Sequence, residues 1–230
     1  MTQTSQPTAL VTGASKGLGR ALARALRDRG WRLVVDARDD TSLAGAVPGS
    51  LTLAGDVGDS RHRDALTAAV RDLGRLDLLV NNASTLGPSP LPALGRYPLD
   101  DLRQVYETDV LAPLALIQLL LPTLRESGGV VLNVSSDAAV EAYPGWGGYG
   151  SAKAALDQLS AVLAAEEPRL RVYAVDPGDM RTDMHQAAFP GEDISDRPSP
   201  ETVVPALLRL LDARPASGRY RASEWIGVPA

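Results

Sequence analysis

The chain alternates short apolar runs with longer segments in which apolar residues recur every three to four positions. Short apolar runs are typical of strands buried on both faces of a parallel sheet, and the longer spacing predicts amphipathic helices. We predict strands at residues 8–11, 32–35, 50–53, 76–80, 129–134, 170–175 and 219–222. We predict helices at residues 17–29, 61–73, 99–125 (with a break near Asp109), 148–167 and 202–212.

Strands that alternate with helices imply right-handed β-α-β crossovers. The pattern therefore predicts an α/β fold, a single-domain Rossmann-type doubly wound parallel sheet flanked by helices on both faces. One domain would cover residues 1–230, with a flexible tail at residues 1–6 and a substrate lid at about residues 183–200, which are rich in Gly, Pro and acid. Ligands of such sheets bind beyond the carboxyl ends of the strands, so the residues that follow each strand carry the functional information.

Composition narrows the function classes. The net charge of −5 argues against a nucleic-acid partner. The absence of cysteine excludes thiol chemistry and cysteine-ligated metals, and we expect no metal. The apolar run at residues 110–121 is too short to span a bilayer, and the polar start lacks a signal peptide, so we expect a cytoplasmic protein without a membrane partner.

A glycine-rich turn follows the first predicted strand and opens the first helix. Thr12–Gly19 reads T-G-A-S-K-G-L-G. Glycines let the backbone approach a pyrophosphate, which free N–H groups at a helix N-terminus can bind. The residues expected to hold a dinucleotide here are Gly13, Ser15, Lys16, Gly17, Leu18 and Gly19.

Two cations point to NADP(H) as the preferred cofactor, with NAD(H) as the alternative. Arg38 follows the second strand and Lys16 lies in the glycine turn, so both can make charge-assisted hydrogen bonds to a 2′-phosphate. Lys16 and Lys153 are the only lysines among 23 basic residues, which suggests that each position needs a compact ammonium. Asp36 would instead favour NAD(H) if it faced the ribose, but strand alternation puts Asp36 and Ala37 on opposite faces.

The third and fourth strands also end in polar residues. Asp56-Val57 can hold the adenine amino group, and Asn81-Asn82-Ala83 can hold a turn and the ribose. Turn chemistry alone explains either site equally well. We include Asp56, Val57, Asn82 and Ala83 among the cofactor-binding candidates.

Candidate catalytic residues follow the fifth strand. Ser135-Ser136 ends this strand, and Tyr149 and Lys153 lie four residues apart on one face of the next helix. A neighbouring ammonium stabilises phenolate, so we expect Lys153 to lower the pKa of Tyr149 towards the range of efficient proton transfer. Ser136 can polarise a carbonyl oxygen while Tyr149 gives or takes the proton.

Taken together and in order, these motifs resemble the short-chain dehydrogenase/reductase family over essentially the whole chain. They are T-G-x3-G-x-G at Thr12–Gly19, D-V at Asp56-Val57, N-N-A at Asn81–Ala83, S-S at Ser135-Ser136, Y-x3-K at Tyr149–Lys153 and P-G-x3-T at Pro177–Thr182. The resemblance implies that Ser136 orients substrate, Tyr149 is the acid/base and Lys153 also binds the nicotinamide ribose. It adds Tyr149, Lys153, Pro177, Gly178 and Thr182 to the cofactor site.

The resemblance also implies that Ala37 faces the ribose, and the pair Lys16 and Arg38 is the pattern of NADP(H)-preferring members. It implies a homodimer or homotetramer, since the helices at residues 109–125 and 149–167 are apolar on more than one face.

Two positions depart from the family pattern. Ser84 follows N-N-A where the family has Gly, and Asp109 stands where the family has an active-site Asn. We include Asp109 among the catalytic candidates, since the family uses the main-chain carbonyl of this position in a proton relay to Lys153. A carboxylate close to Lys153 would favour the ammonium and damp or redirect that relay.

We therefore predict an NADP(H)-dependent oxidoreductase that acts on a small carbonyl or alcohol substrate. The alternative is a catalytically weak nucleotide-binding or regulatory protein of the same fold; an epimerase or dehydratase would need a larger substrate domain. Substrate loops are expected at residues 86–97, 138–147 and 183–200, and His185 is expected to be solvated. Candidates for an apolar lining are Tyr143, Trp146, Met180, Met184 and Phe189.

Overall fold

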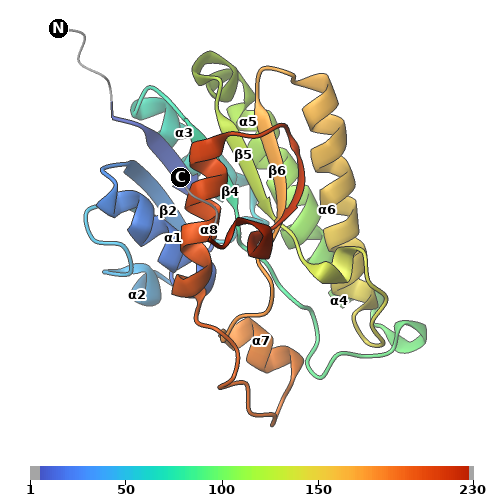
Figure 1. Cartoon of the computed structure of the whole chain (residues 1–230). Helices are drawn as coiled ribbons and strands as arrows, with labels where there is room; N and C mark the ends of the chain where they lie inside the picture. Colours follow the sequence, from blue (N-terminus) through green and yellow to red (C-terminus); the bar gives the residue numbers. More distant parts are fainter. Residues whose placement is uncertain (1–5, 228–230) are drawn as a thin grey trace, which may run out of the picture.

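A computed structural model describes residues 6–227 of the chain. A seven-stranded parallel sheet forms the centre of the protein (Figure 1). The strand order is β3-β2-β1-β4-β5-β6-β7, and every neighbouring pair is parallel. The strands are β1 (Thr8–Val11), β2 (Arg32–Ala37), β3 (Leu51–Ala54), β4 (Leu78–Asn81), β5 (Val130–Val134), β6 (Arg171–Asp176) and β7 (Gly218–Arg221). The predicted doubly wound α/β fold is confirmed.

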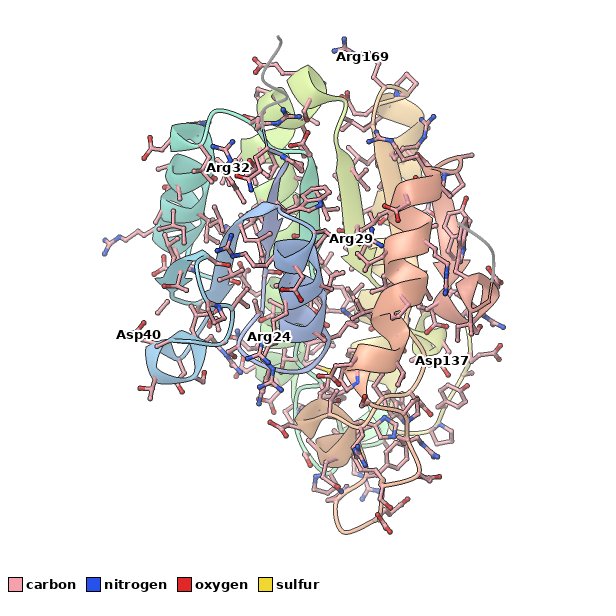
Figure 2. All side chains as sticks on the ribbon, turned by 60° about the vertical axis from the view of Figure 1, so that its left-hand side comes forward. Arg24, Arg29, Arg32, Asp40, Asp137 and Arg169 are labelled. Atoms are coloured by element: carbon pink, nitrogen blue, oxygen red, sulfur yellow. The ribbon has the colours of Figure 1, made fainter. Side chains whose placement is uncertain are left out.

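Helices cover both faces of this sheet (Figure 1). Helices α1 and α8 pack together on one face, where Arg29 at the end of α1 donates to Asp212 of α8 at 2.8 Å (Figure 2). Helices α3, α5 and α6 cover the other face. The α-helices are α1 (Gly17–Asp28), α2 (Asp40–Leu43), α3 (Ser60–Asp72), α4 (Leu99–Tyr106), α5 (Ala112–Ser127), α6 (Gly147–Glu166), α7 (Asp183–Ala188) and α8 (Pro200–Ala213).

The five central strands are apolar because each one buries both faces, whereas the edge strands β3 and β7 are more exposed. In β1, Val11 packs into the cluster that contains the apolar residues of α1 and α8, while Leu10 packs into the cluster formed with α3 and α5. Val35 and Val34 divide between the same two clusters in β2. Alternation along a strand therefore feeds two separate cores, which accounts for the uninterrupted apolar runs.

Two short helices are absent from the predicted set. Helices α2 and α7 span only four and six residues, too few for an apolar period to be visible. Both begin with a capped turn, in which Asp39 accepts from the Thr41 amide and Thr182 from the His185 amide. Helix α7 lies in the predicted lid at residues 183–200. Of the predicted tail, residues 1–5 lie outside the described residues.

The predicted helix break near Asp109 is a π-helical turn. Residues Glu107–Leu111 form this turn between α4 and α5. The combined helix, Leu99–Ser127, is 29 residues long and is the one helix within residues 6–227 that meets a length-and-composition criterion for a membrane span. Core helices meet the same criterion, and Leu116 and Leu120 of this helix are buried against the sheet.

The carboxyl ends of the strands mark the functional end of the molecule. Helix α7 lies beyond these ends (Figure 1). Asp137, which follows β5, lies towards this end, whereas Arg169, which precedes β6, lies at the opposite end (Figure 2). The loops that follow β1, β2, β4, β5 and β6 therefore converge on one edge of the sheet.

Replacing Leu120 by Ala tests the core between α5 and the sheet. Leu120 is 0% exposed, so we expect Leu120→Ala to lower the free energy of unfolding by about 2–5 kcal/mol. Leu99→Ala is the matched control, because Leu99 is 65% exposed, and its effect should stay within about 0.5 kcal/mol. Urea denaturation followed by circular dichroism measures both; equal losses would contradict the packing described.

Candidate functional site

A cavity of about 610 Å³ opens at the carboxyl edge of the sheet. Most of the predicted site residues line it: Gly13, Ser15, Lys16, Gly17, Leu18, Arg38, Asp56, Val57, Asn82, Ala83, Ser136, Tyr149, Lys153, Pro177, Gly178 and Thr182. Gly19 and Asp109 are not in its wall. The cavity is large enough for an extended ligand with one end at the glycine turn and the other at Tyr149.

The glycine turn is held by Asn82, which directly follows β4. The Asn82 side-chain amide donates to the carbonyl oxygens of Thr12 at 2.8 Å and Gly13 at 3.1 Å. Gly13 has a φ of +67°, and a Cβ there would lie 2.9 Å from the Cα of Ala83. A Cβ on Gly19 would lie 2.4 Å from the Gly13 carbonyl oxygen, so Gly19 allows the helix to approach the turn without lining the cavity.

Asp36 is bound to the glycine turn and to a histidine. Its Oδ1 accepts from the Gly13 amide at 2.8 Å, and its Oδ2 lies 3.1 Å from Nε2 of His62 in α3. Burial raises the pKa of Asp36, against the opposing effects of these two partners. The carboxylate thus supports the turn, a role that sequence reasoning missed because His62 lies 26 residues away with no local motif.

The two cations expected at a 2′-phosphate differ in their surroundings. Arg38 is exposed, lines the cavity and makes no hydrogen bond or ion pair with another described residue. Lys16 instead binds Oδ2 of Asp183, the first residue of α7, at 2.8 Å. Asp56 also has a local partner, since its Oδ1 accepts from the Gly58 amide at 2.8 Å.

Tyr149 and Lys153 lie on α6 with both side chains buried. Lys153 Nζ is 5.4 Å from the centre of the Tyr149 ring, as expected for residues one helical turn apart. This ammonium donates to the Val134 carbonyl oxygen at 3.0 Å and lies 3.3 Å from Oδ2 of Asp109. Asp109, which stands where the family pattern has Asn, therefore contacts Lys153 directly through its carboxylate.

The pKa of Tyr149 moves in the opposite direction from the one expected. Burial raises the pKa of the phenol, Lys153 lowers it, Asp109 raises it and Ser136 lowers it, with a net rise above the ordinary value. Burial lowers the pKa of Lys153, but the charges of Asp109 and Tyr149 raise it, and the net direction is upward. The expectation of a phenol brought towards neutrality was wrong because desolvation of the phenolate outweighs the ammonium.

Hydrogen bonds to both the hydroxyl and the carbonyl oxygen of Ser136 position this residue. Its hydroxyl donates to Asp137 Oδ1 at 3.0 Å and accepts from the Ala138 amide at 3.2 Å. Its carbonyl oxygen accepts from Arg219 of β7 at 2.9 Å, and Arg219 also binds Asp157 of α6 at 2.9 Å. Sequence reasoning missed Arg219, since 83 residues separate it from Ser136.

The apolar end of the cavity contains part of the expected lining. Trp146, Met180 and Met184 line it, and Phe189 packs behind Trp146 with ring centres 6.0 Å apart. Tyr143 lies outside it, with its hydroxyl donating to Asp137 at 3.0 Å. The side chain of His185 is only 9% exposed, so the expectation that His185 is solvated was wrong.

Comparisons with known proteins agree on one family. Residues 7–193 match a family described as short chain dehydrogenase. The chain is 37% identical over 199 residues to a sepiapterin reductase of Mus musculus, covering 78% of this chain and 76% of that protein. Among solved structures, a putative short chain dehydrogenase from Pseudomonas syringae matches with a TM-score of 0.88 and 32% identity over 94% of each chain. A putative short chain dehydrogenase from Shigella flexneri, complexed with NADP, matches with a TM-score of 0.88 and 29% identity, covering 94% of this chain and 97% of that one.

Asp36→Ala tests the support of the glycine turn. The substitution leaves the Gly13 amide and His62 without their carboxylate partner, so we expect a loss of about 1–3 kcal/mol in the free energy of unfolding. Asp40→Ala is the control, because Asp40 is exposed at the start of α2. Chemical denaturation of both variants measures the difference; a loss no larger than that of the control would show that Asp36 does not support the turn.

Proposed function

The chain belongs to the short chain dehydrogenase family, and from this premise we propose that it is an NADP(H)-dependent oxidoreductase acting on a small carbonyl or alcohol substrate. The observation that carries the proposal is that Ser136, Tyr149 and Lys153 face the same cavity as the glycine turn. A nucleotide held by the turn would extend along the sheet edge towards the buried phenol.

The residues of the cavity fit a nicotinamide dinucleotide. The glycine turn and the N-terminus of α1 present backbone N–H groups to a pyrophosphate. Asp56, Val57, Asn82 and Ala83 would lie along the adenosine half, and Pro177, Gly178 and Thr182 would hold the nicotinamide half. Arg38 has no partner among the described residues and is therefore available to a 2′-phosphate, which supports NADP(H) over NAD(H).

The chemistry follows from three side chains. The reduced nicotinamide, when bound, supplies a hydride to the carbonyl carbon. The Ser136 hydroxyl, which donates to Asp137 in this structure, turns to donate a hydrogen bond that polarises the carbonyl oxygen, and the Tyr149 hydroxyl donates the proton to it. Lys153 stabilises the phenolate that remains. A protonated Tyr149 is the form needed for reduction, so the raised pKa of this phenol suits a reductase at neutral pH.

One observation favours the alternative of a catalytically weak nucleotide-binding protein. The ion pair of Lys153 with Asp109 engages the ammonium that would otherwise act on Tyr149 alone. We give the reductase precedence because Ser136, Tyr149 and Lys153 all line the cavity. We further propose a cytoplasmic protein and an assembly of two or four chains, in which the partly exposed Leu159 and Leu163 of α6 are covered.

Tyr149→Phe tests the acid/base assignment. Removal of the phenol hydroxyl should lower kcat by about 10²–10⁴-fold while leaving NADPH affinity nearly unchanged. The assay follows NADPH oxidation with a panel of ketones, aldehydes and quinones, to which we add sepiapterin because of the named relatives. Tyr220→Phe is the control, since the Tyr220 hydroxyl donates to the Ala216 carbonyl away from the cavity. Equal rates in wild type and Tyr149→Phe would favour the nucleotide-binding alternative.

Arg38→Ala tests the cofactor preference. Loss of one charge-assisted contact to a 2′-phosphate should weaken NADPH binding by roughly tenfold or more and leave NADH binding unchanged. Fluorescence titration with each nucleotide gives the two dissociation constants. Arg61→Ala is the control, because Arg61 is an exposed arginine of α3 outside the cavity wall. If both nucleotides lose affinity equally, the 2′-phosphate assignment is incorrect.

A further inference from the structure

The two positions that depart from the family pattern contact each other. Ser84, which follows β4, donates a hydrogen bond from its hydroxyl to Oδ2 of Asp109 at 2.6 Å. The next backbone amide, that of Thr85, donates to Oδ1 of Asp109 at 2.9 Å. These residues lie 25 and 24 positions from Asp109 in the sequence. The segment after β4 thus holds both oxygens of one carboxylate.

The held carboxylate forms an ion pair with Lys153. Asp109 is 0% exposed and Lys153 is 2% exposed, and the carboxylate Oδ2 lies 3.3 Å from the ammonium nitrogen. Solvent and salt screen such a buried pair far less than an exposed one. With two hydrogen bonds and the ammonium, Asp109 has the donors that a buried carboxylate requires.

The π-helical turn brings Asp109 into this position. The turn Glu107–Leu111 packs against α6, which carries Tyr149 and Lys153. A π-helical turn changes the direction of side chains relative to a regular α-helix and is frequent at functional sites. Ser84 and Lys153 therefore meet the same oxygen of Asp109, Oδ2.

Other charged and titratable groups also act on these residues. Asp157 of α6 favours the Lys153 ammonium, and Asp137 after β5 disfavours ionisation of Tyr149. Burial raises the pKa of Tyr97, which precedes α4, and the charges of Asp101 and Asp109 raise it further. Asp109 is the carboxylate of this group that forms an ion pair with Lys153.

We propose that Ser84 and Asp109 form a positioning pair, in which Ser84 fixes the Asp109 carboxylate against the Lys153 ammonium beside the Tyr149 phenol. The negative charge of Asp109 then opposes ionisation of Tyr149. This inference rests on the proposed function. A bound reduced nicotinamide would supply the hydride and be oxidised, its C–H bond breaking as the new C–H bond forms at the carbonyl carbon. The π-electron pair of the carbonyl would move to its oxygen, which takes the proton of Tyr149 as the O–H bond breaks. The phenolate then regains a proton from water. Neither Ser84 nor Asp109 gives or takes a proton in this step.

Titration of the phenol tests the pair without any substrate. The near-ultraviolet absorbance of phenolate, taken as the difference from the corresponding Tyr149→Phe protein, reports Tyr149 alone. In Asp109→Asn, the Val134 carbonyl still accepts from Lys153 and keeps it an ammonium. Loss of the negative charge should then shift the Tyr149 titration to lower pH, with a roughly threefold or greater rise in phenolate at a fixed alkaline pH. Asp101→Asn is the matched control, since Asp101 is exposed on α4 and its variant should titrate as wild type.

Ser84→Ala isolates the contribution of the hydroxyl. If Ser84 acts by holding the carboxylate, its replacement shifts the Tyr149 titration in the same direction as Asp109→Asn but by less. In an Asp109→Asn background, Ser84→Ala should add nothing, because the charge that it positions is gone. An unchanged titration in Ser84→Ala, or an equal added shift in the double variant, overturns the role of Ser84. Ser84→Ala still tests the pair if Asp109→Asn fails to fold.

The pH profile of reduction separates this inference from the proposed function. Carbonyl reduction needs protonated Tyr149, so kcat/KM should decrease as the pH rises through the titration of this phenol. In Asp109→Asn this decrease should begin at a lower pH than in wild type. An unchanged phenol titration in Asp109→Asn overturns the positioning pair, whatever the activity. A shifted titration without turnover of any carbonyl in the panel supports the pair and overturns the proposed reaction.

Discussion

The buried ammonium of Lys153 is the charge on which the site depends. An isolated ammonium in the interior would lose its proton, because removal of a charge from water is costly. Here Asp109 and the Val134 carbonyl compensate it, and the pKa of Lys153 is raised in spite of burial. The same carboxylate opposes ionisation of Tyr149, so one ion pair influences both titratable residues of the proposed chemistry.

At the opposite end of the cavity, the backbone of the glycine turn is likewise held by side chains from distant segments of the chain. Asp36 of β2 binds the Gly13 amide, and Asn82, which follows β4, binds two carbonyl oxygens of the turn. These contacts satisfy backbone groups that a sharp turn leaves without intrahelical partners. The turn is thereby shaped before a nucleotide arrives, which reduces the entropic cost of binding.

Sequence reasoning succeeded where one physical rule acts locally. Strand β1 was predicted with its observed bounds because Thr8–Val11 is a short, mostly apolar run between Pro7 and the glycine turn. Strand β2 extends two residues beyond the prediction, since Asp36 and Ala37 continue the ladder to Leu53 and Ala54 of β3 although Asp36 is polar. Helix α7 has no visible period and depends on its cap and on packing of the neighbouring Phe189 against Trp146.

The sequence by itself determined the sheet, its crossovers and the set of residues at its carboxyl edge, because apolar spacing and strand ends are local properties. The tertiary structure alone decided how those residues are charged and paired. It buries Tyr149 deeply enough to reverse the expected direction of its pKa, joins Lys16 to Asp183, and brings Ser84 to Asp109. Desolvation and contacts between distant segments depend on the packing of the whole chain, which no local spacing encodes.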